Sequence, residues 1–282
     1  MFQYKNISIS LMGVINITPN SFSDGGNFNN PNNFFKHANY LIDNGVDILD
    51  LGAESSAPMN KAITINEEIS RFDKNVLPVL DQLPNKIQIS IDTYKIETIQ
   101  YLLSKPCFEK YYNDELLIWN DVSGQTHDIK ALMNKYPKLK YIHCHNLVDD
   151  RSKTLDHMDY SNSELSLKSF FNGSPHLLDP CFGFSKTRQQ NFELWKRLSG
   201  LISTFHENTW VIGISRKSFL RFLDLDKSDP VLITQTEIIQ AILLKELIVA
   251  LSNSKHKIDL IFRMHDPNVF KSIKSSFKFN ET

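Results

Sequence analysis

Four polar side chains that could recognise a planar heterocycle follow short apolar runs at widely separated points of the chain. Asp92, Asn120, Asp179 and Lys217 together offer two carboxylates, an amide and an ammonium group. Such a set presents alternating hydrogen-bond acceptors and donors. When it is buried, it discriminates between ring systems, because a wrong ring leaves polar groups of the protein unpaired. Each residue alone could equally be a helix cap or a strand-end turn, where Asp and Asn are common. The four together favour one binding pocket.

A second group of side chains could bind a phosphate-containing anion. Asn16 follows the first apolar run, and Arg263 and His265 follow the last. Arg is a bidentate partner for phosphate, His adds a donor, and the carbonyl oxygen of Asn can bind a hard cation such as Mg²⁺. These residues predict a pyrophosphate site in which Asn16 is the metal ligand. In the alternative interpretation, Arg263 pairs with Asp266 and has no ligand role.

Both groups need a fold that brings distant segments together, and the pattern of the chain predicts one. Short apolar runs alternate with longer segments of helical periodicity, which is typical of a parallel sheet with crossover helices. Strands are predicted at residues 9–15, 46–51, 87–91, 116–119, 139–144, 175–178, 210–214 and 260–262. Helices are predicted at residues 31–45, 63–83, 94–103, 128–135, 161–172, 187–206, 233–251 and 269–277, and residues 105–115 are expected to form a surface excursion.

Eight strand and helix repeats predict an α/β protein with a single (β/α)8 TIM barrel, and residues 1–282 are expected to form one domain. Active sites of this fold lie in the loops at the C-terminal ends of the strands. Every polar residue of the two groups, together with Ser55 and His145, occupies such a position. A doubly wound open sheet is the alternative, but no GxGxxG motif follows the first strand.

Composition excludes some partners and favours a reducing compartment. A formal net charge of -1 gives no electrostatic basis for binding nucleic acid or an anionic membrane. No apolar run reaches the roughly 18 residues of a membrane span. Cys107, Cys144 and Cys181 lack CxxC spacing and are odd in number, which favours reduced thiols. The chain is therefore expected to be a cytoplasmic protein that acts on small molecules.

The nine histidines do not predict a zinc site. His143 and His145 lie on opposite faces of an extended segment, and no HExxH motif or Cys/His cluster is present. At least one of these two histidines is expected to pack in the core or to support the site. Cys144 and Cys181 are expected to fill apolar space rather than to act as nucleophiles.

Longer stretches of the chain resemble a known family. MGVINITPNSFSDGG, residues 12–26, resembles the first signature of the dihydropteroate synthase family. Further blocks follow in the family's order: GAESSAP at 52–58, SIDTYK at 90–95, WNDVSG at 119–124, LDPCFGFSKT at 178–187, GISRKSF at 213–219 and RMHDP at 263–267. The resemblance covers nearly the whole chain and implies a pterin-binding (β/α)8 barrel that acts as a transferase in folate biosynthesis.

The resemblance also implies a reaction, in which 6-hydroxymethyl-7,8-dihydropterin pyrophosphate and p-aminobenzoate give 7,8-dihydropteroate and pyrophosphate with Mg²⁺ as cofactor. It implies that the pterin is bound by Asp92, Asn120, Asp179 and Lys217, the pyrophosphate by Asn16, Arg263 and His265, the metal by Asn16, and p-aminobenzoate by Phe22, Asp24, Ser56, Pro58, Lys217 and Ser218. The implied catalytic residues are Lys217, Asp92, Asp179, Arg263 and His265. A homodimer formed through barrel helices, with residues 238–251 as a candidate face, is implied as well. Sulfonamides resemble p-aminobenzoate, so the chain is expected to be a sulfonamide target.

Four positions depart from the family pattern, two of them in the second loop. The departures are Asn20 for Asp, Ala57 for Arg, Met59 for Gly and Ser185 for Gly. The family's Arg at the position of Ala57 helps to retain pyrophosphate. Its loss would weaken the transition state by about 1.5–3 kcal/mol, unless Lys61 or Arg151 replaces it.

These departures motivate two alternatives. One is a pterin-binding paralogue that has lost turnover and acts as a binding or regulatory protein, although Asn16, Lys217, Arg263 and His265 are intact. The other is the pterin-binding domain of a methyltetrahydrofolate-dependent methyltransferase. That family needs no pyrophosphate site, so Arg263 and His265 disfavour it.

Overall fold

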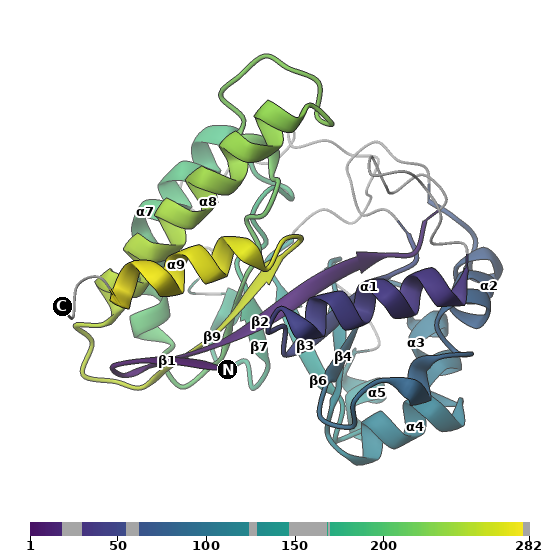
Figure 1. Ribbon diagram of the computed structural model, residues 1–282. Coiled ribbons are helices and arrows are strands. Elements are labelled where there is room, and N and C mark those ends of the chain that lie inside the picture. Colours follow the sequence, from purple (N-terminus) through teal and green to yellow (C-terminus); the bar gives the residue numbers. More distant parts are fainter. Residues whose placement is uncertain (19–29, 55–61, 124–128, 147–167, 169, 279–282) are drawn as a thin grey trace.

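Parallel strands close into a barrel in the computed structural model of the chain, which describes residues 1–18, 30–54, 62–123, 129–146, 168 and 170–278. The strands are β2 (Ile7–Asn16), β3 (Ile48–Gly52), β4 (Gln88–Asp92), β5 (Leu117–Asp121), β6 (Lys140–Cys144), β7 (Leu177–Asp179), β8 (Trp210–Ile212) and β9 (Ile258–Met264). They pair in chain order, and β2 also pairs with β9, with Ile7 opposite Ile258 and Gly13 opposite Met264. The predicted (β/α)8 TIM barrel is confirmed, and its first and last strands lie side by side (Figure 1).

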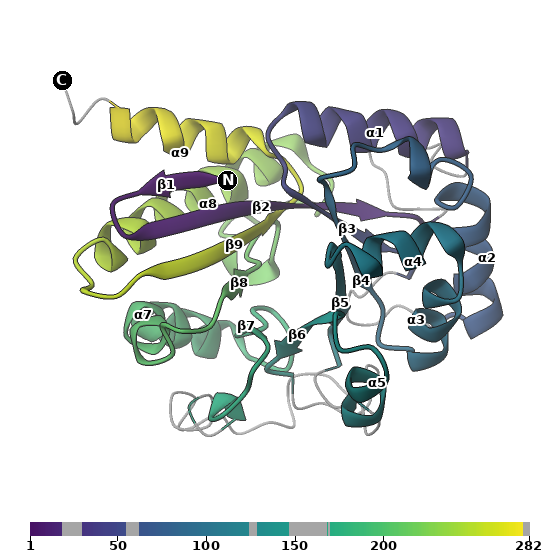
Figure 2. The same cartoon turned by 90° about the horizontal axis from the view of Figure 1, so that it is seen from below.

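Helices surround the barrel on its outside (Figure 2). Those of the described ranges are α1 (Pro31–Asp43), α2 (Ile65–Asn75), α3 (Ile96–Leu103), α4 (Pro106–Asn113), α5 (Ile129–Lys135), α7 (Arg188–Thr204), α8 (Pro230–Leu251) and α9 (Asn268–Lys278). Each packs an apolar stripe on the strands; in α1 the stripe is Phe34, Ala38 and Leu41. Thr187 and Gln190 form a capping box that begins α7. Within the described ranges, no helix combines the length and the apolar character that crossing a membrane requires.

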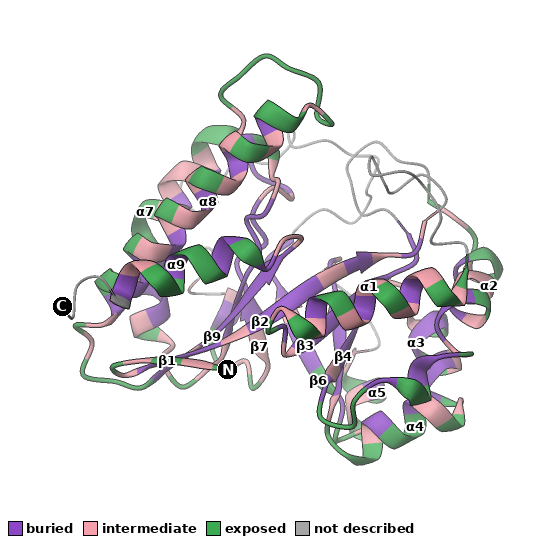
Figure 3. Cartoon of the chain, viewed as in Figure 1, coloured by how far each residue is buried: buried purple, intermediate pink, exposed green. Residues whose placement is uncertain are grey.

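The barrel interior changes from apolar to polar along the strands. Residues two apart on a strand point to the same face. Ile118 and Ile261 belong to an apolar interior cluster, and two positions later on the same strands come Asn120 and Arg263. The cluster consists of Met12, Ile48, Ile118, Ile142, Cys144, Cys181, Val211 and Ile261. Figure 3 shows the strands as the most buried part of the chain. Their C-terminal ends carry the polar layer.

Two elements differ from the sequence prediction. Residues 105–115, expected as a surface excursion, instead contain the helix α4. Pro106 occupies its first turn, where a missing N–H is tolerated, and Phe108 and Tyr111 are buried one turn apart. The charges of Glu109 and Lys110 obscure this short stripe in the sequence. The other difference is β1 (Phe2–Tyr4), which pairs antiparallel with the beginning of β2 and is too short to show an alternating pattern.

Of the helix predicted at 161–172, only residues 168 and 170–172 belong to the described part of the chain. The helix predicted at 63–83 ends already at Asn75, and a 3-10 turn (Leu80–Gln82) follows it. The remaining predicted elements are present with ends shifted by a few residues. Such shifts are expected because sequence patterns locate the middle of an element better than its ends.

Candidate active site

The predicted polar residues meet at the C-terminal end of the barrel. Asn16, the last residue of β2, lies opposite Gly52 at the end of β3, and Gly52 lies opposite Asp92 at the end of β4. Asp92 in turn lies opposite Asn120 on β5, and Asp179 ends β7. Residues far apart in the sequence therefore lie together at the C-terminal opening of the barrel, the mouth.

The floor of this mouth is a buried layer of Asp50, Asn120, Asp179 and Arg263. Asp50 accepts a hydrogen bond from the Ser90 hydroxyl at 2.6 Å, and its two oxygens lie 3.2 Å from Nδ2 of Asn120. These contacts fix the orientation of the Asn120 amide. Burial raises the pKa of Asp50, while the charge of Arg263 and the hydrogen bonds oppose this rise.

Asp50 is a site residue that the sequence analysis missed. It lies inside the apolar run ILDLG of β3, so it was included in a buried strand. Its position two residues before Gly52 places both on the interior face, at the end of the strand that forms the mouth. A carboxylate at that position in an otherwise apolar barrel strand is the signal that could have identified it.

Arg263 forms an ion pair with Asp179, which replaces the alternative pairing with Asp266. Nη2 of Arg263 lies 3.1 Å from Oδ2 of Asp179, and the two side chains are 10% and 1% exposed. Burial disfavours the charge on Arg263, but the carboxylates of Asp179 and Asp50 outweigh it and raise the pKa of the guanidinium. Nη1 of Arg263 is buried and has no hydrogen-bond partner among the described residues. This charged donor suits an anionic ligand.

A partly exposed rim lies above the floor, and its members are Asn16, Asp92, Lys217 and His265. Burial, and then the carboxylate of Asp50, raise the pKa of Asp92 to about 8. Burial, and then the charge of Arg263, lower the pKa of Lys217 to about 8. Titratable groups whose environment shifts them this far are typical of functional sites.

The environment of Lys217 includes an aromatic ring that the sequence analysis did not assign to the site. Its Nζ lies 4.0 Å from the centre of the Phe184 ring, within the range of a cation–π contact. Ser218 begins a 3-10 turn (Ser218–Leu220) beside Lys217 and is exposed. The ammonium group is therefore held between the floor and a flat apolar surface.

Glycines leave room for three charged side chains of the site. A Cβ atom on Gly213 would lie 2.8 Å from Nε and Nη2 of Arg263, and one on Gly183 would lie 3.0 Å from Cδ of Lys217. A Cβ atom on Gly52 would lie 3.2 Å from Oδ2 of Asp92. Each glycine is therefore part of the site, because a larger residue would displace the charged group.

The same Gly52 position shows how a cation would fit. A Cβ atom there would also lie 3.7 Å from Oδ1 of Asn16, so oxygens of Asn16 and Asp92 converge on one small space. Oxygen is the donor that Mg²⁺ prefers, and this ion commonly takes one or two protein oxygens together with substrate phosphates and water. Within the described ranges, no group of three or more His, Cys, Asp and Glu side chains could hold a metal ion. The two protein oxygens therefore suit a Mg²⁺ ion whose other ligands come from a phosphate-containing substrate and from water.

A buried lysine holds the segment between β7 and α7 that faces Lys217. Nζ of Lys186 donates to the carbonyl oxygens of His145 at 2.8 Å and of Cys181 and Phe184 at 3.3 Å. Burial lowers the pKa of Lys186 to about 8. Ser185 has a φ of 49°, in the left-handed region that favours glycine. A Ser at this position leaves the turn fewer conformations than a Gly would.

The two histidines of the fifth predicted strand have different surroundings. His145 is fully buried and its ring packs edge-on against Phe170, which confirms the core role predicted for at least one of them. Burial lowers the pKa of His145 to about 2. Nδ1 of His143 lies 3.0 Å from Oγ of Ser174. Cys144 and Cys181 are buried and not in disulfides, as an apolar filling role requires.

The residues predicted for p-aminobenzoate binding from the first and second loops lie outside the described residues. They are Phe22, Asp24, Ser56 and Pro58. The same holds for Ser55 and for the family departures Asn20, Ala57 and Met59, and for Lys61 and Arg151. Their roles stay predictions.

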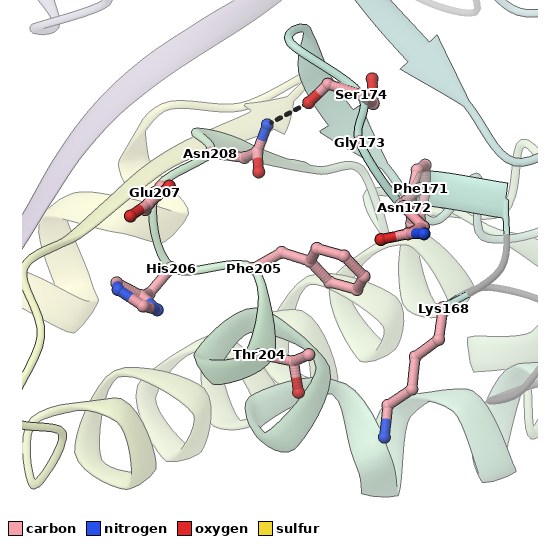
Figure 4. Close-up of a pocket in the computed structure, with 10 residues that line it drawn as sticks. All are labelled: Lys168, Phe171, Asn172, Gly173, Ser174, Thr204, Phe205, His206, Glu207 and Asn208. Atoms are coloured by element: carbon pink, nitrogen blue, oxygen red, sulfur yellow. Dashed lines mark hydrogen bonds between the residues drawn. The ribbon is translucent and has the colours of Figure 1, made fainter.

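A cleft of 860 Å³ opens at the opposite end of the barrel (Figure 4). It is lined by residues that precede β7 and β8: Lys168, Phe171, Asn172, Gly173, Ser174, Thr204, Phe205, His206, Glu207 and Asn208. Nδ2 of Asn208 donates to the carbonyl oxygens of Ser174 at 2.9 Å and His176 at 3.1 Å. No predicted site residue is among the described residues that line this cleft. Despite its volume, the cleft is therefore not the predicted active site.

Comparisons with known proteins agree with the geometry of the mouth. Residues 12–248 match the family described as pterin binding enzyme. A dihydropteroate synthase of Staphylococcus epidermidis is 31% identical over 230 residues, which cover 79% of this chain and 81% of that protein. One of Bacillus subtilis is 30% identical over 240 residues, covering 79% and 75%. A crystal structure of dihydropteroate synthase from Clostridium difficile, obtained in the presence of pteroic acid, covers 99% of both chains with a TM-score of 0.74 and 27% identity.

Proposed function

This chain belongs to the pterin binding enzyme family, and we infer from its relatives and its site that it is a dihydropteroate synthase, a transferase of folate synthesis. The enzyme condenses 6-hydroxymethyl-7,8-dihydropterin pyrophosphate with p-aminobenzoate to 7,8-dihydropteroate and pyrophosphate. The structural observation that carries this conclusion is a single mouth that combines buried carboxylates with an arginine whose Nη1 has no partner in the described residues. Carboxylates suit the pterin, and the guanidinium suits the pyrophosphate.

Each part of the pterin substrate is bound by residues of both the floor and the rim. Asp92, Asn120, Asp179 and Lys217 bind the pterin ring, and their mixture of acceptors and donors selects it. Asn16, Arg263 and His265 bind the pyrophosphate. Lys217 and the exposed Ser218 would bind p-aminobenzoate, and the predicted residues Phe22, Asp24, Ser56 and Pro58 would complete its site. Sulfonamides, which resemble p-aminobenzoate, would compete for the same place.

The reaction is a substitution at the methylene carbon of the pterin substrate. The bond between this carbon and the bridging oxygen breaks, and its electron pair leaves with pyrophosphate. The amine of p-aminobenzoate forms the new C–N bond and then loses a proton. The carboxylates of Asp92 and Asp179 stabilise positive charge on the pterin, while Arg263 and His265 donate to the departing anion. An ionised Asp92 serves this role best, and its pKa near 8 makes the first step depend on pH.

Mg²⁺ is the proposed cofactor, and Asn16 is its proposed protein ligand, with Asp92 beside it. When bound, the ion would neutralise charge on the pyrophosphate. The support for this proposal is the pair of oxygens that converge beside Gly52. Turnover that is lost on chelation and restored by Mg²⁺, with a higher Mg²⁺ requirement in Asn16→Ala, would bear it out. Full turnover in excess chelator would contradict it.

We also propose that the chain forms a homodimer through α8. This helix exposes Val231, Ile238, Ile242 and Val249, which are 60, 56, 52 and 46% exposed and fall on one stripe with spacings of seven, four and seven residues. Such spacing is typical of helices that pair, and an exposed apolar stripe indicates an interface. Ile238→Glu should convert a dimer into a monomer in light scattering, whereas Glu246→Gln should not.

The cytoplasmic location and the absence of nucleic-acid partners are proposals too. All three cysteines are reduced, which suits a reducing compartment, and the net charge is near zero. The binding-only alternative and the methyltransferase alternative have no support from the relatives, which are named as synthases.

Pyrophosphate release by the purified protein tests the proposed reaction. The assay contains Mg²⁺, the dihydropterin pyrophosphate and p-aminobenzoate, with Lys217→Ala as the control variant. We expect release that requires p-aminobenzoate and is lost in the variant. Calorimetric binding of the pterin without any release would instead support the binding-only paralogue.

A further inference from the structure

A serine and a histidine face each other across the last two strands at the mouth. β8 and β9 pair with Ile212 opposite Phe262, and Ser215 and His265 each follow three residues later, beyond the strand ends. Oγ of Ser215 lies 3.0 Å from Nδ1 of His265 and 3.3 Å from the backbone nitrogen of the same residue. Ser215 is 7% exposed, so its hydroxyl group is largely shielded from solvent.

The two contacts together determine which nitrogen of His265 carries a proton. The backbone N–H of His265 can only donate, so Oγ of Ser215 accepts from it. The Ser215 hydroxyl also has one proton to donate, and within the described ranges Nδ1 of His265 is its only recorded acceptor. A proton on Nδ1 would leave this buried hydroxyl without an acceptor, which is unfavourable. Nδ1 is therefore the acceptor, and the proton of a neutral ring is on Nε2.

His265 is neutral in the folded protein. Burial, and then the positive charges of Arg216, Lys217 and Arg263, lower its pKa to about 3. Above about pH 5 the ring therefore has one N–H group, which lies on one nitrogen or on the other. Nδ1 of the ring is bound to Ser215, so Nε2 is the nitrogen left for a ligand.

We propose that Ser215 is a positioning residue that holds His265 as the Nε2–H tautomer, so that the ring offers one neutral hydrogen-bond donor to the leaving pyrophosphate. This proposal rests on the proposed function for the identity of the anion, but the tautomer itself does not depend on the reaction. The arrangement adds a donor beside Arg263 and Lys217 without adding a third positive charge to the mouth. With the opposite tautomer, Nε2 would present a lone pair to the anion and repel it.

A second serine and histidine pair provides a matched control. Nδ1 of His143 lies 3.0 Å from Oγ of Ser174, and Oγ of Ser174 also accepts from the backbone N–H of His176 at 3.4 Å. Burial, and then the neighbouring His176, lower the pKa of His143 to about 4. The His143 ring packs against Phe170, and Ser174 lines the cleft at the other end of the barrel. This pair has the same local chemistry but no contact with the proposed substrates.

Nitrogen-15 NMR of histidine-labelled protein without ligands tests the tautomer directly, because protonated and unprotonated ring nitrogens have well-separated chemical shifts. In the wild type we expect His265 with a protonated Nε2 and an unprotonated Nδ1 at pH 7. Ser215→Ala should give a mixture of tautomers, and Ser215→Thr, which keeps the hydroxyl, should restore the single form. A wild-type His265 with Nδ1 protonated, or an unchanged single form in Ser215→Ala, would overturn the proposal.

Binding of inorganic pyrophosphate, measured by calorimetry with Mg²⁺ present, tests the consequence. Ser215→Ala should weaken binding about three- to tenfold, the loss expected for one hydrogen bond, and Ser215→Thr should recover most of it. Ser174→Ala should change the His143 signals and leave pyrophosphate binding unchanged. If the tautomer changes as expected but pyrophosphate binding does not, the positioning role is wrong. If both change while no synthase activity is found, the proposed reaction is wrong and the positioning role holds.

Discussion

The two ends of the barrel treat their polar groups differently. At the N-terminal end, side chains bind the backbone: Nδ2 of Asn6 donates to the carbonyl oxygens of Ser254 at 3.2 Å and His256 at 2.6 Å. Asn208 binds two further carbonyl oxygens in the same way. At the C-terminal end Lys186 also binds carbonyl oxygens, but the ionisable side chains of the floor and the rim lie together, and Nη1 of Arg263 has no partner in the described part of the chain.

This difference indicates that the polar groups at the N-terminal end serve stability, whereas those at the C-terminal end serve ligand binding. A side chain that binds carbonyl oxygens of its own chain needs no ligand, so the polar groups at the N-terminal end hold the loops between elements. A charged group with a remaining donor in a buried place costs stability, and a ligand can offset this cost. The cleft in Figure 4 belongs to the first kind of region, although it is large.

Arg263→Ala should have the largest effect on activity. It removes the charged donor to pyrophosphate and leaves the Asp179 carboxylate buried without its partner. We expect kcat to fall about 10²- to 10³-fold, as for other donors to a developing negative charge. Steady-state kinetics check this, with Arg263→Lys as the matched variant that keeps the positive charge but loses the bidentate geometry of the guanidinium group. Activity within threefold of wild type in Arg263→Ala would contradict a role at the mouth.

Gly213→Ala should lower activity by a smaller amount, about ten- to a hundredfold, because the new methyl group displaces the guanidinium that now lies 2.8 Å from its position. Gly200→Ala in α7 is the matched control, since a Cβ atom there meets no atom within 4 Å. The control should keep full activity and gain about 0.5–1 kcal/mol of unfolding free energy. Equal activities of the two variants in the same assay would show that Arg263 tolerates displacement.

Asn208→Ala should affect stability and leave activity unchanged. It removes two hydrogen bonds at the N-terminal end and leaves the carbonyl oxygens of Ser174 and His176 without this donor. We expect a loss of about 2 kcal/mol in the free energy of unfolding, measured by urea denaturation, with kcat/KM within twofold of wild type at a temperature where both proteins are folded. A large loss of kcat/KM with unchanged stability would reverse the proposed division between the two ends.

Asp92→Asn should show a stability effect that depends on pH. The pKa of Asp92 is raised from 3.8 to about 8 by folding, so the folded state holds this proton more tightly than the unfolded state. Wild-type stability is therefore lost as the pH rises from about 4 through 8, and the neutral Asn escapes this loss. The unfolding free energy of the variant relative to wild type should therefore grow with pH over this range. We expect a growth of only about 1 kcal/mol, because solvent around the partly exposed carboxyl group screens part of the effect. Urea denaturation at pH 5 and pH 8 measures it, and an advantage that shrinks with pH would be incompatible with this shift.

Sequence patterns were sufficient for the barrel because its strands are buried on both faces and appear as apolar runs between helical segments. They also located Asp92, Asn120 and Asp179, each of which lies at the end of such a run. Asp50 was missed because its carboxylate lies within a run, where only the closed barrel shows which face it occupies. The role of Gly213 depends on a contact with Arg263 that no sequence pattern contains.

The pairing of Arg263 with Asp179 could not be predicted from the sequence for a related reason. Asp266 is three residues away in the chain and Asp179 is on another strand, so local spacing favours the wrong partner. Closure of the barrel and burial decide between them. The helix α4 was missed because two apolar residues among charges are too few to show a period.

A crystal structure with the dihydropterin pyrophosphate and Mg²⁺ bound tests the central claim most directly. The account predicts the pterin ring at the mouth, against Asp92, Asn120 and Asp179, with the diphosphate on Nη1 of Arg263 and on Nε2 of His265. A substrate bound instead in the cleft beside Asn208, or a diphosphate that makes no contact with Arg263, would contradict it.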